Sequence, residues 1–154
     1  MLWKEADRAP WGVIMMFGGG LALAASITTS GLAAWLGTVL APLGSMPTIV
    51  LAVVIVALTI LITEFASNVA TASGIMPVLA ALIAATGVDP VLLALPVAMA
   101  ASWGFMLPSG TGPNALAWAT DHIALPRMLK AGLALDIIGV PLLIGVIWAI
   151  AALA

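Results

Sequence analysis

A short polar stretch interrupts an otherwise apolar run near the middle of the sequence. Residues 63 to 72 bring together a carboxylate at Glu64, an amide at Asn68 and hydroxyls at Thr63 and Ser67. In a hydrocarbon environment an unpaired polar group is costly, so such groups persist where they bind a partner, line water or cap broken helices. This stretch is therefore the first candidate for a functional site.

A second interruption follows at residues 107 to 114, with the sequence Leu-Pro-Ser-Gly-Thr-Gly-Pro-Asn. Its two prolines and two glycines cannot keep a helical hydrogen-bond ladder intact, although residues 91 to 106 before it and 115 to 118 after it are apolar. The freed backbone groups need partners, and half-helix ends carry partial charges suited to ions. Helix N-termini face anions, and unwound carbonyls face cations.

The composition indicates a membrane protein. The 154 residues have a mean hydropathy of +1.30 and only 6% charged side chains, against about 25% in an ordinary soluble domain. The basic residues Lys4, Arg8, Arg127 and Lys130 form two pairs far apart in sequence, which leaves no basic patch to hold nucleic acid. Cysteine is absent, so disulfides and thiolate metal sites are excluded.

The apolar segments predict an all-α membrane protein in one transmembrane unit. We expect a span at 10–30, an interfacial helix at 31–43, a re-entrant hairpin at 47–86, a broken span at 90–120 and a final span at 128–151. The polar stretch would form the hairpin tip. Two complete spans are the alternative, but the joint holds no proline, glycine or basic residue, which favours the hairpin.

The charges predict an orientation. One crossing, a hairpin that returns to its own side and a second crossing bring Arg127 and Lys130 to the side of Lys4 and Arg8. The positive-inside rule assigns that side to the cytoplasm, with the N-terminus inside and the C-terminus outside. Two full spans in place of the hairpin give the same parity, so charge does not separate the two alternatives.

Three motifs follow one another along nearly the whole chain. They are Trp11-Gly12-Val13 with Phe17 to Leu23, then Thr63 to Asn68, then Phe105 to Pro108 with Thr111 to Asn114. In this order and spacing they resemble the divalent anion/sodium symporter family, the carriers of succinate, citrate and sulfate. The resemblance implies a sodium-coupled secondary transporter in the cytoplasmic (inner) membrane, with sodium as coupling ion and no other cofactor or metal.

The resemblance also implies that this chain is the second of two inverted repeats. Each repeat of the family contributes a re-entrant hairpin and a broken transmembrane helix. We therefore expect a C-terminal half that needs a missing N-terminal repeat or a second polypeptide, and a complete carrier that forms a homodimer in membrane lipid. An elevator-like or rocking movement of the hairpin and broken helix is implied by the resemblance alone.

Site residues carry over by motif. The resemblance implies sodium ligands at Thr63, Ala66, Asn68 and Gly110. It implies that the carboxylate of the dicarboxylate or other divalent anion faces Ser67, Asn68, Val69, Thr111 and Gly112. Two positions depart from the family pattern: Val69 stands where threonine is usual, and Gly112 where proline is usual. A valine at position 69 removes one hydroxyl donor to a carboxylate.

Other roles are open for several of these polar residues. Glu64 is either a proton-linked carboxylate or a structural acceptor for amides of the neighbouring loop. Ser67 and Asn68 are also typical helix caps, and Asn114 could cap the second half-helix. His122, beside Asp121, is expected to be a surface loop residue.

Two other classes of function are alternatives to a carrier. A truncated or orphan half-transporter would act as a non-transporting membrane assembly partner, and upstream sequence with a second hairpin motif would argue against it. An enzyme is not expected. The sequence offers a single loop histidine and no cysteine, and we expect no pair of carboxylates at mid-span to serve as nucleophile and base.

Overall fold

The computed structural model describes residues 15 to 153, with gaps at 16–17, 20–21, 23–24 and 27–28. Most of the expected first span, its tryptophan motif, and Lys4 and Arg8 lie outside the described residues. The part of the chain that the structure describes consists of helices and loops and contains no strand, which confirms the all-α prediction.

The main helices, in chain order, are α3 (Leu32–Leu40), the 3-10 helix η1 (Ala41–Ser45), α4 (Thr48–Phe65), α5 (Asn68–Thr86), α6 (Pro90–Ala100), α7 (Gly112–Ala119) and α8 (Leu125–Leu153). Three of them, α4, α5 and α8, are long and apolar enough to cross a membrane. Two helices differ from the expected bounds. Helix α6 ends six residues before the apolar run does, and α8 begins three residues before position 128.

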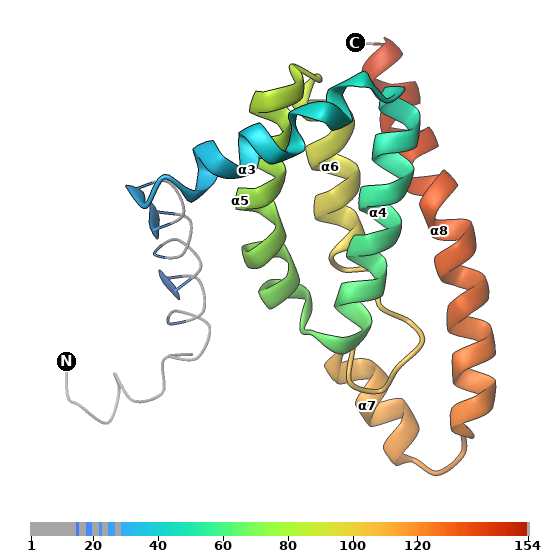
Figure 1. Cartoon of the computed structure of the whole chain (residues 1–154). Helices are drawn as coiled ribbons and strands as arrows, with labels where there is room; N and C mark the ends of the chain where they lie inside the picture. The colour runs from blue at the N-terminus through green and yellow to red at the C-terminus, as the bar shows by residue number, and fades with distance from the viewer. Residues whose placement is uncertain (1–14, 16–17, 20–21, 23–24, 27–28, 154) are drawn as a thin grey trace, which may run out of the picture.

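Helix α6 lies at the centre of the fold, where it contacts α4, α5 and α8 (Figure 1). Helices α4 and α5 run side by side and join at the end of the molecule opposite the C-terminus, and α7 lies beyond that joint. The four helices share one apolar core, whose buried members are Leu51, Ala52, Val56, Ile60, Leu79, Leu82, Leu93, Val97, Ala100, Leu143 and Ile144.

Local capping explains where the helices stop. Helix α4 ends at Phe65, and its C-cap Ala66 has an extended backbone with φ −120° and ψ 155°. Ser67 then starts α5 as its N-cap, and its hydroxyl accepts a hydrogen bond of 3.3 Å from the amide of Ala70. Helix α5 ends at Thr86, and its C-cap Gly87 has the positive φ (70°) of a left-handed cap. Asp89 and Pro90 then begin α6 as N-cap and first residue.

One face of α4 carries the core into the polar stretch. Ala52, Val56 and Thr59 are fully buried at helical spacing, and the same face continues to the buried side chains of Thr63 and Glu64. The opposite face exposes large apolar side chains, which is the pattern of a helix that meets lipid or another apolar surface. Polar groups at the end of α4 therefore point toward α6 and α8, away from that outer surface.

Candidate functional site

The joint between α4 and α5 is tied to the end of α6. Only Ala66 and Ser67 separate the two helices. The hydroxyl of Thr63, fully buried, donates a hydrogen bond of 2.6 Å to the carbonyl of Ala101 and lies 3.2 Å from the amide oxygen of Asn68. One side chain thus links the joint of α4 and α5 to the C-terminal end of α6.

Glu64 organises the loop that follows α6. Its Oε1 accepts hydrogen bonds from the amides of Phe105 (2.6 Å) and Met106 (2.9 Å), and its Oε2 accepts one from Leu107 (2.8 Å). The side chain is 2% exposed. These three bonds satisfy amides that the end of α6 leaves without helical partners, so Glu64 is a structural acceptor for the neighbouring loop, one of the two roles open from the sequence.

The loop also approaches the carbonyl end of α4 closely. A β-carbon placed on Gly110 would lie 3.5 Å from the carbonyl oxygens of both Thr63 and Glu64, and one placed on Gly104 would lie 3.3 Å from that of Thr63. The hydroxyl of Ser109 donates to the carbonyl of Glu64 at 3.3 Å. The backbone before α7 therefore lies directly against the last turn of α4.

Asn114 holds the loop from the other side. Its side-chain nitrogen, Nδ2, donates hydrogen bonds to the backbone carbonyls of Gly104 (3.0 Å) and Leu107 (3.2 Å). Thr111, not Asn114, is the N-cap of α7, because its hydroxyl accepts a hydrogen bond of 3.3 Å from the amide of Asn114. The suggestion that Asn114 caps the second half-helix is therefore wrong, and its side chain binds carbonyls of the preceding loop instead.

The structure brings together most of the residues suggested for sodium. Thr63 lies against both Asn68 and Gly110 at the carbonyl end of α4, and Ala66 is half-buried in the joint itself. The carbonyl oxygens of Thr63 and Glu64 and the amide oxygen of Asn68 lie in this region, and the C-terminal end of α4 adds partial negative charge. The arrangement can bind a cation through neutral oxygen ligands.

The residues suggested for the anion divide between two helix N-termini. Ser67 is an exposed N-cap and Val69 is half-buried in the first turn of α5. Thr111 is the half-buried N-cap of α7, and a β-carbon on Gly112 would meet open space. Ser67 and Thr111 thus act as caps, while both N-termini present the partial positive charge that favours anions.

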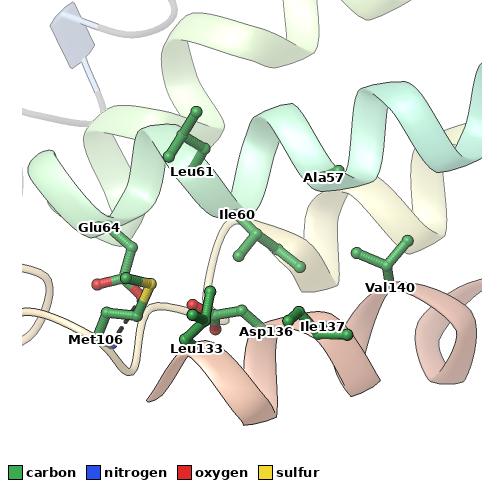
Figure 2. Close-up of a pocket in the computed structure, with 9 residues that line it drawn as sticks. All are labelled: Ala57, Ile60, Leu61, Glu64, Met106, Leu133, Asp136, Ile137 and Val140. Carbon is green, nitrogen blue, oxygen red and sulfur yellow. Dashed lines mark hydrogen bonds between the residues drawn. The ribbon is translucent and has the colours of Figure 1, made fainter. Parts of the chain in front are cut away.

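Sequence reasoning missed Asp136, which lies on α8 opposite Glu64. Asp136 is 6% exposed, and both acids line one cavity of about 290 Å³ together with Met106 (Figure 2). The expectation that no two carboxylates meet inside the bundle is therefore wrong. The available signal was that Asp136 is the only ionisable residue between Lys130 and the end of the chain.

His122 lies in the loop between α7 and α8. His122 is exposed, as expected for a surface loop, and its Nδ1 lies 2.6 Å from the carbonyl of Thr120. Within the described residues, histidine, cysteine and acidic side chains form no group of three that could hold a metal ion.

Comparison with known proteins identifies the family. Residues 1–153 match the model of the sodium:sulfate symporter transmembrane region. The chain is 42% identical over 146 residues to the sodium-dependent dicarboxylate transporter SdcS of Staphylococcus saprophyticus, which covers 95% of this chain and 28% of that protein. The SdcS proteins of Staphylococcus aureus strains USA300 and MRSA252 are 43% and 44% identical over the same share.

These relatives are transporters rather than enzymes, as the sequence predicts, and this chain spans just over a quarter of their length. The motifs that suggested a divalent anion carrier thus agree with a match over nearly the whole chain. Together with three helices that can cross a membrane, the match leads to one conclusion. The chain is an integral membrane protein that belongs to the sodium:sulfate symporter family.

Proposed function

We propose that this chain forms the C-terminal repeat of a sodium-coupled carrier of dicarboxylates or related divalent anions in the cytoplasmic membrane. One observation carries the proposal: at the joint of α4 and α5, the hydroxyl of Thr63 lies 3.2 Å from the amide oxygen of Asn68, and the carbonyl of Thr63 lies against Gly110 before α7. Two interrupted helical elements thus share one small volume. In secondary transporters such volumes hold substrate and coupling ion.

The depth of the joint supports a re-entrant hairpin. Glu64, in the last turn of α4, lines the same cavity as Asp136 of α8. Asp136 lies roughly 16 Å along α8 from Leu125, in a helix roughly 44 Å long. If α8 spans the bilayer, the joint lies well inside it, whereas a loop between two complete spans would lie near one end of α8.

A broken helix accounts for α6 and α7. Helix α6 has 11 residues and α7 has 8, so each is too short to cross a hydrocarbon core of about 30 Å. The loop between them is satisfied inside the protein by Glu64 and Asn114. Irregular backbone at membrane depth is tolerated under that condition.

The proposed ion site uses Thr63, Ala66, Asn68 and Gly110. Backbone carbonyls at the end of α4 and the amide oxygen of Asn68 supply neutral ligands of the kind that bind sodium in transporters. The proposed anion site uses the N-termini of α5 and α7, with Ser67, Asn68, Val69, Thr111 and Gly112. A bound cation offsets the charge of the incoming dianion, so each site strengthens the other reciprocally.

The orientation proposed from the sequence fits the described helices. Arg127 and Lys130 are exposed at the start of α8, at the end of the molecule opposite the C-terminus (Figure 1). A cytoplasmic location for both cations puts the C-terminus outside and opens the hairpin to the outside. Protease accessibility of a C-terminal tag on intact cells measures this directly.

Substitution of Asn68 by alanine tests the ion site. The protein is expressed from its complete reading frame and reconstituted in vesicles. Asn68→Ala removes one proposed sodium ligand and should raise the sodium concentration for half-maximal succinate uptake about tenfold, which corresponds to a loss of roughly 1.4 kcal/mol in sodium binding. Thr38→Ala, which removes an exposed hydroxyl bonded within α3, is the matched control. Unchanged sodium dependence in Asn68→Ala would reject the ligand assignment.

The same vesicles separate the carrier from the non-transporting alternative. Uptake of labelled succinate, citrate and sulfate with and without sodium should show at least one sodium-dependent substrate. Well-folded protein in the vesicles without uptake of any of the three would favour an assembly partner. The homodimer and the missing repeat implied by the resemblance belong to this same proposal.

A further inference from the structure

Helix α8, which carries Asp136, packs closely against the loop that follows α6. Gly132, Asp136 and Gly139 recur at helical spacing on one buried face of α8. A β-carbon on Gly132 would collide with the backbone of Met106, and one on Gly139 would collide with the indole of Trp103. The two glycines therefore allow the close approach that brings Asp136 to Glu64.

The two acids of this contact have different partners. Glu64 accepts three backbone hydrogen bonds, which match a carboxylate that only accepts. Both carboxyl oxygens of Asp136 are buried and lack a hydrogen-bond donor among the described residues. Asp136 faces Glu64 in the cavity that both side chains line. Two carboxyl groups can share a hydrogen bond only if one of them carries a proton.

No cationic side chain among the described residues lies beside this pair. The rest of the cavity is lined by alanine, isoleucine, leucine, methionine and valine side chains. Helix α4 contributes Glu64 alone, the loop from 101 to 111 contains no ionisable residue, and Asp89 of α6 lies at the far end of that helix. Lys130, the nearest basic residue on α8, is exposed and lies six residues before Asp136. Two unpaired negative charges in such a place would be very costly.

We propose that Asp136 is a proton-binding site, which holds one proton at neutral pH and donates it in a hydrogen bond to the carboxylate of Glu64. A shared proton needs one group that carries it and one group that accepts the hydrogen bond, and the two acids supply both. A dehydrated metal ion would need several oxygen ligands, which the hydrocarbon lining of the cavity does not offer. This site is separate from the proposed sodium and anion sites and goes beyond the proposed transport function.

The proton would link α8 to the loop before α7. Protonated Asp136 binds Glu64, and Glu64 in turn holds the amides of residues 105 to 107. Loss of the proton would set two like charges against each other across the cavity and loosen this contact. The ionisation of Asp136 would thereby control how firmly α8 holds the loop that carries Gly110 and Thr111.

Infrared spectroscopy tests the proposal without a transport assay. Protein expressed from its complete reading frame, in lipid nanodiscs near neutral pH, should show the C=O stretching band of a protonated carboxyl group. Asp136→Asn should abolish that band. Asp121→Asn, at an exposed acid with a positive φ of 59° that asparagine also adopts, should keep it. Persistence of the band in Asp136→Asn, or its absence from the wild type, would overturn the proposal.

A sodium titration of the wild-type protein distinguishes a proton from a metal ion and requires no variant to fold. The band should be the same in sodium chloride and in choline chloride. Its loss on addition of sodium would mean that sodium displaces the proton and occupies the acid pair, which contradicts a site for a proton alone. Because neither measurement depends on uptake, a failure here leaves the proposed carrier function to its own test.

Discussion

The hydroxyl of Thr63 donates a hydrogen bond of 2.6 Å to the carbonyl of Ala101, and this bond joins the last turn of α4 to the C-terminal end of α6. Ala101 caps α6, and its carbonyl has no helical partner beyond that point. Because both residues are at most 1% exposed, water cannot replace the donor. The bond holds the joint of α4 and α5 against the broken segment.

Removal of this hydroxyl should destabilise the protein. Thr63→Val keeps the shape of the side chain but leaves the Ala101 carbonyl unsatisfied, at a cost of about 1–3 kcal/mol. Thermal unfolding in detergent should show a lower midpoint for Thr63→Val, while Thr63→Ser, which keeps the donor, should lie closer to the wild type. Equal midpoints for the valine and serine variants would show that the hydrogen bond is not what stabilises the joint.

Several features of the fold could be predicted from single segments. Ser67 caps α5 within the polar stretch, as its residue type predicts, because this signal depends on nearby residues, whereas the cap of α7 is Thr111 and not the suggested Asn114. The early end of α6 at Ala100 could not be predicted in this way. Residues 101 to 106 are apolar apart from Ser102, and the amides of Phe105 and Met106 bind the distant side chain of Glu64 instead of helical carbonyls.

The acid pair was missed for a related reason. Helical spacing tells which residues share a face of one helix, but it does not tell which faces of different helices meet. Asp136 meets Glu64 because Gly132 and Gly139 allow α8 to approach the loop, and that approach is a property of the packed bundle. A lone acid in an apolar span was the only local signal.

Substitution of Glu64 by glutamine should loosen the loop before α7. The glutamine side chain has one carbonyl oxygen, so its NH₂ group would face an amide that now donates to the carboxylate. Hydrogen exchange at residues 105 to 107 should accelerate, since hydrogen bonds to a charged acceptor contribute about 1.5–3 kcal/mol each. Amides within α5 serve as an internal reference. Unchanged protection at 105 to 107 would contradict the structural role of Glu64.

Two glycines of α8 form a matched pair for testing the close packing. A β-carbon on Gly132 would collide with the backbone of Met106, whereas one on Gly145 would have nothing within 4 Å. Gly132→Ala should therefore cost about 1–3 kcal/mol through overpacking. Gly145→Ala should be neutral or stabilising, because alanine favours a helix over glycine by about 1 kcal/mol. Thermal unfolding midpoints that fall equally in both variants would argue against the contact.

Position 69 offers a test of the proposed anion site. Val69 lies half-buried in the first turn of α5, next to Asn68, where a threonine would add a hydroxyl donor at a helix N-terminus. If the anion binds there, Val69→Thr should lower the succinate concentration for half-maximal uptake several-fold, since one hydrogen bond contributes about 0.5–1.5 kcal/mol. Val53→Thr, on the exposed face of α4, controls for a hydroxyl added elsewhere on the bundle. An unchanged succinate dependence in Val69→Thr, with normal sodium dependence, would place position 69 outside the anion site.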